Sequence, residues 1–209
     1  MNFYLISPSQ NNINFNLKNF EKISSIINVK YLQLRPKFDE KKFEEQFLIE
    51  KYNEFNNFCK HKKIKLIIND NLKMAKKLNA DGVHLGQNDC KCRDARKFLG
   101  QSFEIGISCN DSIFFAKEAQ KNGADYIAFG PAFRSVSKVT PKKNIDLNDL
   151  KKKTKSLSTP YFIIGGVNHG NIKKLISLKI KNVALINSIW NFVEGPVKSA
   201  ELYKKTLGL

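Results

Sequence analysis

The sequence lacks the features that carry a chain into or across a membrane. No apolar run approaches the roughly 20 residues that a membrane-spanning helix requires. Residues 1–8 contain neither the basic start nor the apolar stretch of a secretory signal peptide. We therefore predict that the protein works in the cytoplasm and has no membrane partner.

Cysteine is scarce as well. The four cysteines, Cys59, Cys90, Cys92 and Cys109, are too few and too unevenly spaced for a disulfide framework in a chain of 209 residues. Cys90 and Cys92 could form half of a metal site, but no second pair of ligands has suitable spacing. We predict reduced thiols with structural roles.

The three histidines of the sequence give no Ser-His-Asp arrangement. His61 and His169 fall on a predicted helix or at a predicted helix start, and His84 lies inside a predicted strand. We interpret each as a structural residue with satisfied ring nitrogens rather than as a catalytic base.

Acidic residues are few beside basic ones, 19 against 36, which gives a net charge of +17. A strongly basic chain is typical of proteins that bind the phosphate backbone of nucleic acids. Here, however, the lysines are spread over nearly every predicted helix, and no nucleic-acid-binding motif accompanies them. We interpret the charge as a compositional bias that attracts anionic metabolites, and we predict no nucleic-acid partner.

What the sequence does contain is a regular alternation of two patterns. Short apolar runs rich in β-branched and aromatic residues are each followed by a longer segment with helical spacing, for example residues 43–58 and 112–122. Such alternation is typical of a parallel sheet covered by helices. The predicted strands are residues 3–6, 31–34, 65–68, 82–85, 104–107, 126–129, 161–164 and 183–186.

Eight such strands are enough to close a barrel, whereas an open doubly wound sheet usually has fewer. We therefore predict an α/β fold in which residues 1–209 form a single (β/α)8 TIM barrel, with the open sheet as the alternative. The active site of such a barrel lies where its strands end. The connection 131–144 has no clear secondary structure, and loops of that length are usually functional.

Two aspartates follow neighbouring predicted strands. Asp70 comes after the third strand and Asp89 after the fourth. Because adjacent strands lie about 4.8 Å apart, both carboxylates can reach one cation, and Mg²⁺ typically takes one or two carboxylates plus water and phosphate oxygens. The alternative is that each aspartate merely caps the helix that follows it.

Cations and glycines at other strand ends indicate two anion sites. Arg35 and Lys37 follow the second strand, and Lys138 lies on the long connection, so the three could hold a diphosphate beside Mg²⁺. Arg35 is the stronger signal, because arginine is rare in this chain. Gly165 and Gly166 after the seventh strand are typical of a barrel phosphate site, although such a pair can equally form a tight turn.

Taken in order, the residues at the strand ends resemble those of the thiamine phosphate synthase family over almost the whole chain. Several of these segments are generic for barrels, but the ordered set is specific. The matching segments are Gln33-Leu34-Arg35 with Lys37; 66–70; 80–87 with Asp89; 105–108; 123–126 with 129–131; Ser135, Ser137 and Lys138; and Ile164-Gly165-Gly166.

The resemblance implies a transferase of thiamine biosynthesis that joins hydroxymethylpyrimidine diphosphate to a thiazole phosphate and releases diphosphate, leaving thiamine phosphate. In that family the bond to diphosphate breaks first, and the thiazole nitrogen captures the pyrimidine carbocation. These two small molecules are the implied partners and Mg²⁺ the implied cofactor. Whether copies of the chain form a homo-oligomer stays open.

The resemblance also implies a role for each residue at the strand ends. Asp70 and Asp89 would bind Mg²⁺. The pyrimidine diphosphate would be held by Gln33, Arg35, Lys37, Asn69, Ser108 and Lys138, of which Arg35, Lys37 and Lys138 would act in catalysis. The thiazole phosphate would be held by Ser135, Ser137, Gly166, Ile186 and Asn187.

Some positions depart from the pattern of the family. Pro36 stands where an acidic residue is usual, Ser135 and Ser137 replace threonines, and Asn187 stands where serine is usual. Most departures fall on the thiazole side, which leaves two alternatives to the synthase. One is a thiazole tautomerase on the same barrel, which would lose the metal aspartates; the other is a non-catalytic metabolite or nucleic-acid binding protein.

Overall fold

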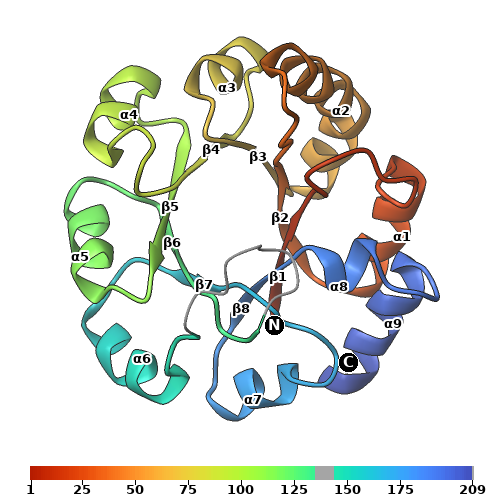
Figure 1. The fold of residues 1–209 in the computed structure, drawn as a ribbon, viewed down its shortest axis with the longest axis vertical. Coiled ribbons are helices and arrows are strands. Elements are labelled where there is room, and N and C mark those ends of the chain that lie inside the picture. Colours follow the sequence, from red (N-terminus) through yellow and green to blue (C-terminus); the bar gives the residue numbers. More distant parts are fainter. Residues whose placement is uncertain (135–143, 209) are drawn as a thin grey trace.

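The computed structural model describes residues 1–134 and 144–208, so the predicted site residues Ser135, Ser137 and Lys138 lie outside the described residues. Eight short strands form the centre of the molecule, and helices surround them (Figure 1). The strands are β1 (Asn2–Ile6), β2 (Val29–Leu34), β3 (Lys65–Asn69), β4 (Gly82–Leu85), β5 (Glu104–Asn110), β6 (Tyr126–Phe129), β7 (Tyr161–Ile163) and β8 (Asn182–Leu185).

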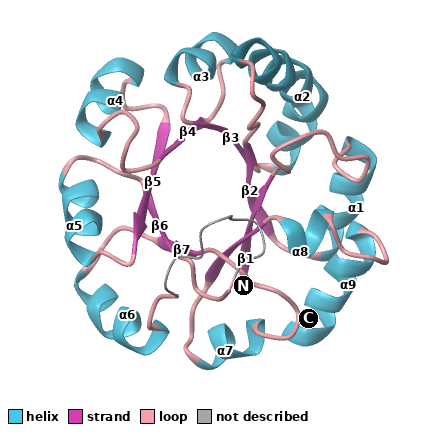
Figure 2. Cartoon of the chain, viewed as in Figure 1, coloured by secondary structure: helices cyan, strands magenta, loops and turns pink. Residues whose placement is uncertain are grey.

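Each strand pairs in parallel with the next one in the sequence, and β8 pairs with β1 to close the barrel. Figure 2 shows this ring of strands with the helices outside it. The predicted (β/α)8 barrel is therefore confirmed, and the open-sheet alternative is wrong. The eight predicted strands are all present, with ends that differ by up to three residues.

The helices lie outside the ring of strands. Their bounds are α1 (Leu17–Ile26), α2 (Lys41–Lys62), α3 (Leu72–Leu78), α4 (Cys92–Leu99), α5 (Ile113–Lys121), α6 (Leu147–Lys153), α7 (Ile172–Ser177), α8 (Asn187–Trp190) and α9 (Pro196–Leu207), with a short 3-10 turn at Thr154–Ser156. Local chemistry sets several of these limits. The Ser112 hydroxyl accepts a hydrogen bond from the Phe115 N–H at the start of α5, and α2 ends where Lys63 adopts a left-handed conformation.

Alternation along each strand divides its apolar residues between two cores. In β3, Leu66 and Ile68 face the layer of helices, while Ile67 faces the barrel interior. The interior is filled by a small group of buried side chains that includes Tyr4 and Tyr126. Strands buried on both faces need nearly continuous apolar sequence, which explains why they were recognisable from the sequence.

The cysteines are unpaired, as predicted. Cys59, Cys92 and Cys109 are buried and Cys90 is partly exposed. Burial raises the pKa of the Cys59 and Cys109 thiols to about 12, which makes them poor nucleophiles near neutral pH. In the part of the chain that the structure describes, no helix is both long enough and apolar enough to cross a membrane.

Candidate active site

Parallel strands place all their carboxyl ends on one rim of the barrel, and a cavity of about 1040 Å³ opens there. Two groups of strand ends surround it. The β2–β5 arc comprises Gln33, Arg35, Lys37, Asn69, Asp70, Asp89 and Ser108, and all of these residues line the cavity. The β6–β8 arc comprises Gly165, Gly166, Ile186 and Asn187, of which Gly165 and Ile186 line it.

The cationic segment after β2 is held against the end of β1. The Arg35 backbone N–H donates to Ser7 Oγ at 2.8 Å, and the Lys37 backbone N–H donates to the Ser9 carbonyl at 2.7 Å. Burial lowers the pKa of the Arg35 guanidinium, although the charge of Asp70 opposes this effect. Arg35 is thus a partly desolvated cation whose interaction with an anion is strengthened by the low local dielectric.

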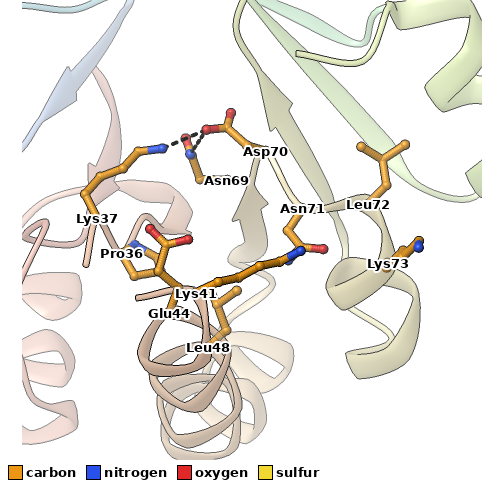
Figure 3. Close-up of a pocket in the computed structure, with 10 residues that line it drawn as sticks. All are labelled: Pro36, Lys37, Lys41, Glu44, Leu48, Asn69, Asp70, Asn71, Leu72 and Lys73. Atoms are coloured by element: carbon orange, nitrogen blue, oxygen red, sulfur yellow. Dashed lines mark hydrogen bonds and ion pairs between the residues drawn. The ribbon is translucent and has the colours of Figure 1, made fainter. Parts of the chain in front are cut away.

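Asp70 is held in place by three neighbours. Its carboxylate accepts a hydrogen bond from the Asn69 side chain at 2.5 Å and pairs with Lys37 Nζ at 3.0 Å (Figure 3). Its backbone N–H donates to the His84 carbonyl on the adjacent strand at 2.9 Å. Asn71, not Asp70, caps α3, because the Asn71 side chain accepts from the Met74 N–H. The capping alternative is therefore wrong for Asp70.

Asp89 approaches the same point from the end of β4. Its carboxylate accepts a hydrogen bond from the Gly86 N–H at 2.7 Å, which folds the segment after β4 back on itself. Partial burial and the adjoining Asp70 carboxyl raise the pKa of Asp89, so the two acidic side chains are close neighbours. Lys91 occupies the N-cap position of α4, and the capping alternative is wrong for Asp89 as well.

A second hollow, of about 330 Å³, adjoins the first one on the outer side of Lys37 and Asp70. Figure 3 shows it between the start of α2 and the start of α3, with Lys37 reaching across to Asp70. Lys41, Lys73 and Glu44 also line it, so this hollow holds two further cations and one further carboxylate beside the Lys37–Asp70 pair.

Ser108 and His84 form the floor of the β2–β5 arc. His84 Nε2 lies 2.8 Å from Ser108 Oγ, and His84 Nδ1 lies 3.2 Å from the Tyr126 hydroxyl. Burial lowers the pKa of His84 to about 4, with a further contribution from the charge of Arg35. Both ring nitrogens are satisfied, as predicted, but the sequence did not predict that His84 also lines the cavity.

Apart from Arg134, the β6–β8 side of the cavity, as far as the structure describes it, is shaped by backbone rather than by charged side chains. Gly165 and Gly166 have φ values of 95° and 66°, which favour glycine. A Cβ on Gly165 would lie 2.6 Å from Pro131 Cα, and one on Gly166 would lie 2.5 Å from the Arg134 carbonyl oxygen. Gly165 and Gly166 therefore form a tight turn on which the segment after β6 packs. A phosphate bound at this turn would have to lie beside that segment.

Several cavity residues were missed from the sequence. They are His84, Gln87, Asn88, Asn110, Arg134 and Asn144. Arg134 could have been found, since it is one of four arginines in the chain and follows a predicted strand. Asn187 begins α8 and is outside the cavity lining, whereas Ile186 lines it as predicted.

The sequence model described as thiamine monophosphate synthase matches residues 3–189 of this chain. The chain belongs to the thiamine-phosphate synthase family. A thiamine-phosphate synthase of Pelagibacter ubique (strain HTCC1062) is 40% identical over 189 residues, which cover 90% of this chain and 88% of the relative. A second synthase, from Prochlorococcus marinus (strain AS9601), is 40% identical over 154 residues, and the match spans 74% of this chain but 43% of that longer protein.

Solved structures show the same fold. The thiamine phosphate pyrophosphorylase from Pyrococcus furiosus superposes with a TM-score of 0.80 at 23% identity, covering 99% of this chain and 95% of that one. A 3-hexulose-6-phosphate synthase superposes with a TM-score of 0.65 at 14% identity, covering 97% of this chain and 99% of that one. At these identities the likeness shows the barrel alone, which hosts different chemistries. The family and its relatives confirm the predicted activity: a thiamine-phosphate synthase, a transferase of thiamine biosynthesis.

Proposed function

We propose that the β2–β5 arc binds the pyrimidine diphosphate, with Mg²⁺ held between Asp70 and Asp89. One observation carries this proposal: two carboxylates from adjacent strands, the cations Arg35 and Lys37, and the Asn69 amide all converge on one side of the cavity. Arg35 and Lys37 can neutralise the charge that develops on the diphosphate as it departs.

The donor set suits Mg²⁺. Asp70 and Asp89 offer oxygen ligands only, and no cluster of three or more His, Cys, Asp or Glu side chains occurs within residues 1–134 and 144–208. Mg²⁺ commonly takes one or two carboxylates and completes its shell with water and phosphate oxygens. Burial and the neighbouring Asp70 carboxyl raise the pKa of Asp89, and a bound cation would favour the charged form of both carboxylates. When bound, Mg²⁺ would supply positive charge to the leaving diphosphate.

The reaction of the family needs a charge clamp more than a base. The C–O bond to the diphosphate breaks and its electron pair leaves with the phosphate oxygen; the lone pair of the thiazole nitrogen then forms the new C–N bond. No proton moves in either step. A buried neutral His84 and a lysine and arginine pair beside the leaving group agree with that requirement.

The thiazole phosphate is assigned to the β6–β8 arc on the strength of the family resemblance. Ile186 and Gly165 line the cavity there and support the assignment, with Gly166 beside them. Asn187 follows directly at the start of α8. Ser135, Ser137 and Lys138 belong to the same proposal through the resemblance alone, because they lie outside the described residues.

The decisive test combines an assay with a binding measurement. Purified protein, Mg²⁺, hydroxymethylpyrimidine diphosphate and thiazole phosphate should release diphosphate and form thiamine phosphate. Thiazole isomerisation without diphosphate release would favour the tautomerase, and binding without turnover would favour the non-catalytic protein. Calorimetry of Mg²⁺ with diphosphate should show binding to the wild type and a loss of it in Asp70→Asn, independently of turnover.

A further inference from the structure

A continuous row of hydrogen-bonded side chains crosses the barrel interior beneath the cavity. Gln33 Nε2 on β2 donates to the Tyr4 hydroxyl on β1 at 2.7 Å. The Tyr4 and Tyr126 hydroxyls lie 2.8 Å apart, Tyr126 on β6 lies 3.2 Å from His84 Nδ1 on β4, and His84 Nε2 lies 2.8 Å from Ser108 Oγ on β5. We call this row of five residues the interior relay.

The interior relay is rigidly packed. Tyr4, Gln33 and Tyr126 are each at most 1% exposed. The ring of His84 stacks on that of Tyr126, with centroids 5.6 Å apart and planes 21° apart. The Tyr126 ring fills the place of a side chain at Gly106, where a Cβ would lie 2.0 Å from Tyr126 Cζ. The four buried groups, Gln33, Tyr4, Tyr126 and His84, are held tightly enough to keep one hydrogen-bonding pattern.

The hydrogens along the relay can be ordered from its two ends. The amide nitrogen of Gln33 can only donate, so the Tyr4 oxygen accepts and its own hydrogen must go to Tyr126. The Tyr126 hydrogen then goes to His84 Nδ1, which leaves the hydrogen of the neutral imidazole on Nε2. That N–H donates to Ser108 Oγ, and the Ser108 hydrogen remains for a ligand in the cavity.

The reverse order requires the Gln33 amide to be turned. If Ser108 donated to His84 and His84 donated to Tyr126, the Tyr4 oxygen would accept from Tyr126, and the Tyr4 hydrogen would need the amide oxygen of Gln33 as its acceptor. The structure places the amide nitrogen of Gln33 beside Tyr4, and with that orientation the Tyr4 hydrogen would have no acceptor among the described residues. A buried donor without an acceptor is costly, so the first order is favoured.

We propose that Tyr126 and His84 are positioning residues that fix Ser108 as a hydrogen-bond donor, and that Tyr4 holds the amide nitrogen of Gln33 so that the amide oxygen is left as an acceptor. This inference rests on the proposed function, in which both residues contact the pyrimidine diphosphate. A pyrimidine ring that offers an N–H group to the Gln33 oxygen and a nitrogen lone pair to the Ser108 hydroxyl would then bind in a single orientation. That orientation fixes which carbon faces the diphosphate clamp.

The tautomer of His84 gives a readout that does not require turnover. In ¹⁵N-labelled full-length protein, long-range proton–nitrogen correlation distinguishes a protonated ring nitrogen from a bare one. Spectra of His61→Gln and His169→Gln would assign the His84 signals by elimination. We expect His84 to carry its hydrogen on Nε2, and a hydrogen on Nδ1 in the wild type would overturn the inference.

Substitutions along the relay should have graded effects. Tyr126→Phe removes the donor to His84 Nδ1, so the tautomer should become mixed and KM for the pyrimidine diphosphate should rise roughly tenfold, with KM for the thiazole within about twofold. Tyr4→Phe leaves that donor in place and should keep the Nε2–H tautomer. Tyr31→Phe is the matched control, because Tyr31 packs against both tyrosines but donates to Glu104.

The outcomes separate the relay from the synthase assignment. Equal changes in both KM values, or a Tyr31→Phe effect as large as that of Tyr126→Phe, would overturn the positioning role. An Nδ1–H tautomer in an active synthase would refute the relay and leave the function standing. An Nε2–H tautomer in a protein without synthase activity would support the relay order and refute the function. If Tyr126→Phe does not fold, the spectra of the wild type and Tyr4→Phe still test the relay, because a hydrogen on His84 Nδ1 in either protein would overturn it.

Discussion

The two arcs around the cavity are built by different means. In the β2–β5 arc, charged and amide side chains hold one another in place, as Lys37 and Asn69 hold Asp70. In the β6–β8 arc, left-handed glycines allow one backbone segment to lie directly on another. A diphosphate that leaves during the reaction needs positive charge around it to stabilise the transition state. A phosphate group that takes no part in bond breaking needs only a binding site of matching shape.

The largest effect should come from the carboxylates of the β2–β5 arc. Asp70→Asn or Asp89→Asn keeps the size of the side chain but removes a proposed metal ligand, so kcat should fall by roughly 100- to 1000-fold. The melting temperature should barely change, because the side chains of Lys37 and Asp70 are 46% and 31% exposed and such solvent-accessible pairs add little stability.

Asp39→Asn is the matched control for these variants. Asp39 is exposed on the segment between β2 and α2, and its replacement should leave turnover unchanged. Wild-type turnover in both Asp70→Asn and Asp89→Asn would refute the metal site and remove the contrast between the arcs.

In the β6–β8 arc the expected effect is on folding. Gly166→Ala combines a left-handed backbone with a collision against the Arg134 and Phe133 carbonyl oxygens, so the free energy of unfolding should drop by about 3 kcal/mol. Gly208→Ala has a similar φ of 70° with open space around its Cβ, and it should cost about 1 kcal/mol. Urea denaturation of both variants measures the difference. Equal losses of unfolding free energy in the two variants would show that the packing of the segment after β6 on Gly166 adds nothing to stability.

Lys138 tests whether the two arcs are functionally separate. It follows β6 in the sequence, yet the resemblance assigns it to the diphosphate. Lys138→Ala should raise KM for the pyrimidine diphosphate by roughly tenfold and leave KM for the thiazole phosphate nearly unchanged. Lys152→Ala, at an exposed position of α6, is the control. If KM changed for the thiazole phosphate alone, the division between the arcs would be misplaced.

The smallest effect concerns acid stability of the β6–β8 arc. His169 follows Gly166, and its Nε2 lies 3.0 Å from Ser199 Oγ on α9. Since Ser199 Oγ donates its own hydrogen to the Ser188 carbonyl, it accepts from His169. His169 Nε2 also lies 3.1 Å from the Ser199 carbonyl oxygen. Burial lowers the pKa of His169, although the hydrogen bond to that backbone carbonyl opposes this effect.

A lowered pKa fixes the sign of the pH dependence. The folded protein binds fewer protons than the unfolded chain below the unfolded pKa of about 6.5. The stability from His169 is therefore present above that pH and is lost as the pH falls through the lowered folded pKa. Urea denaturation should show that the difference in unfolding free energy between wild type and His169→Phe shrinks as the pH falls from 7 to 5. Parallel plots of unfolding free energy against pH would contradict this.

Most of the barrel could be predicted because each strand carries its own signal. Leu66, Ile67 and Ile68 form an apolar run whose burial on both faces follows from a parallel sheet. Asp70 and Asp89 could be found for a related reason: parallel strands bring their ends to one rim, whatever the details of packing.

The interior relay could not be predicted, because its order depends on contacts between residues far apart in the chain. Tyr4 and Tyr126 are separated by 122 positions, and each appears in the sequence as one more aromatic residue in an apolar strand. The role of His84 at the cavity floor was hidden in the same way, since period-two alternation alone does not say which face of β4 meets the cavity.

The left-handed backbone at Asp70 has a consequence for how this protein can change. With φ of 58°, the position readily admits glycine, asparagine and aspartate, and other side chains pay a steric penalty. Among these three, aspartate alone brings a negative charge. Replacement by asparagine should therefore leave the fold intact while removing the proposed Mg²⁺ ligand, so the stability of the barrel does not select against the loss of activity at this position.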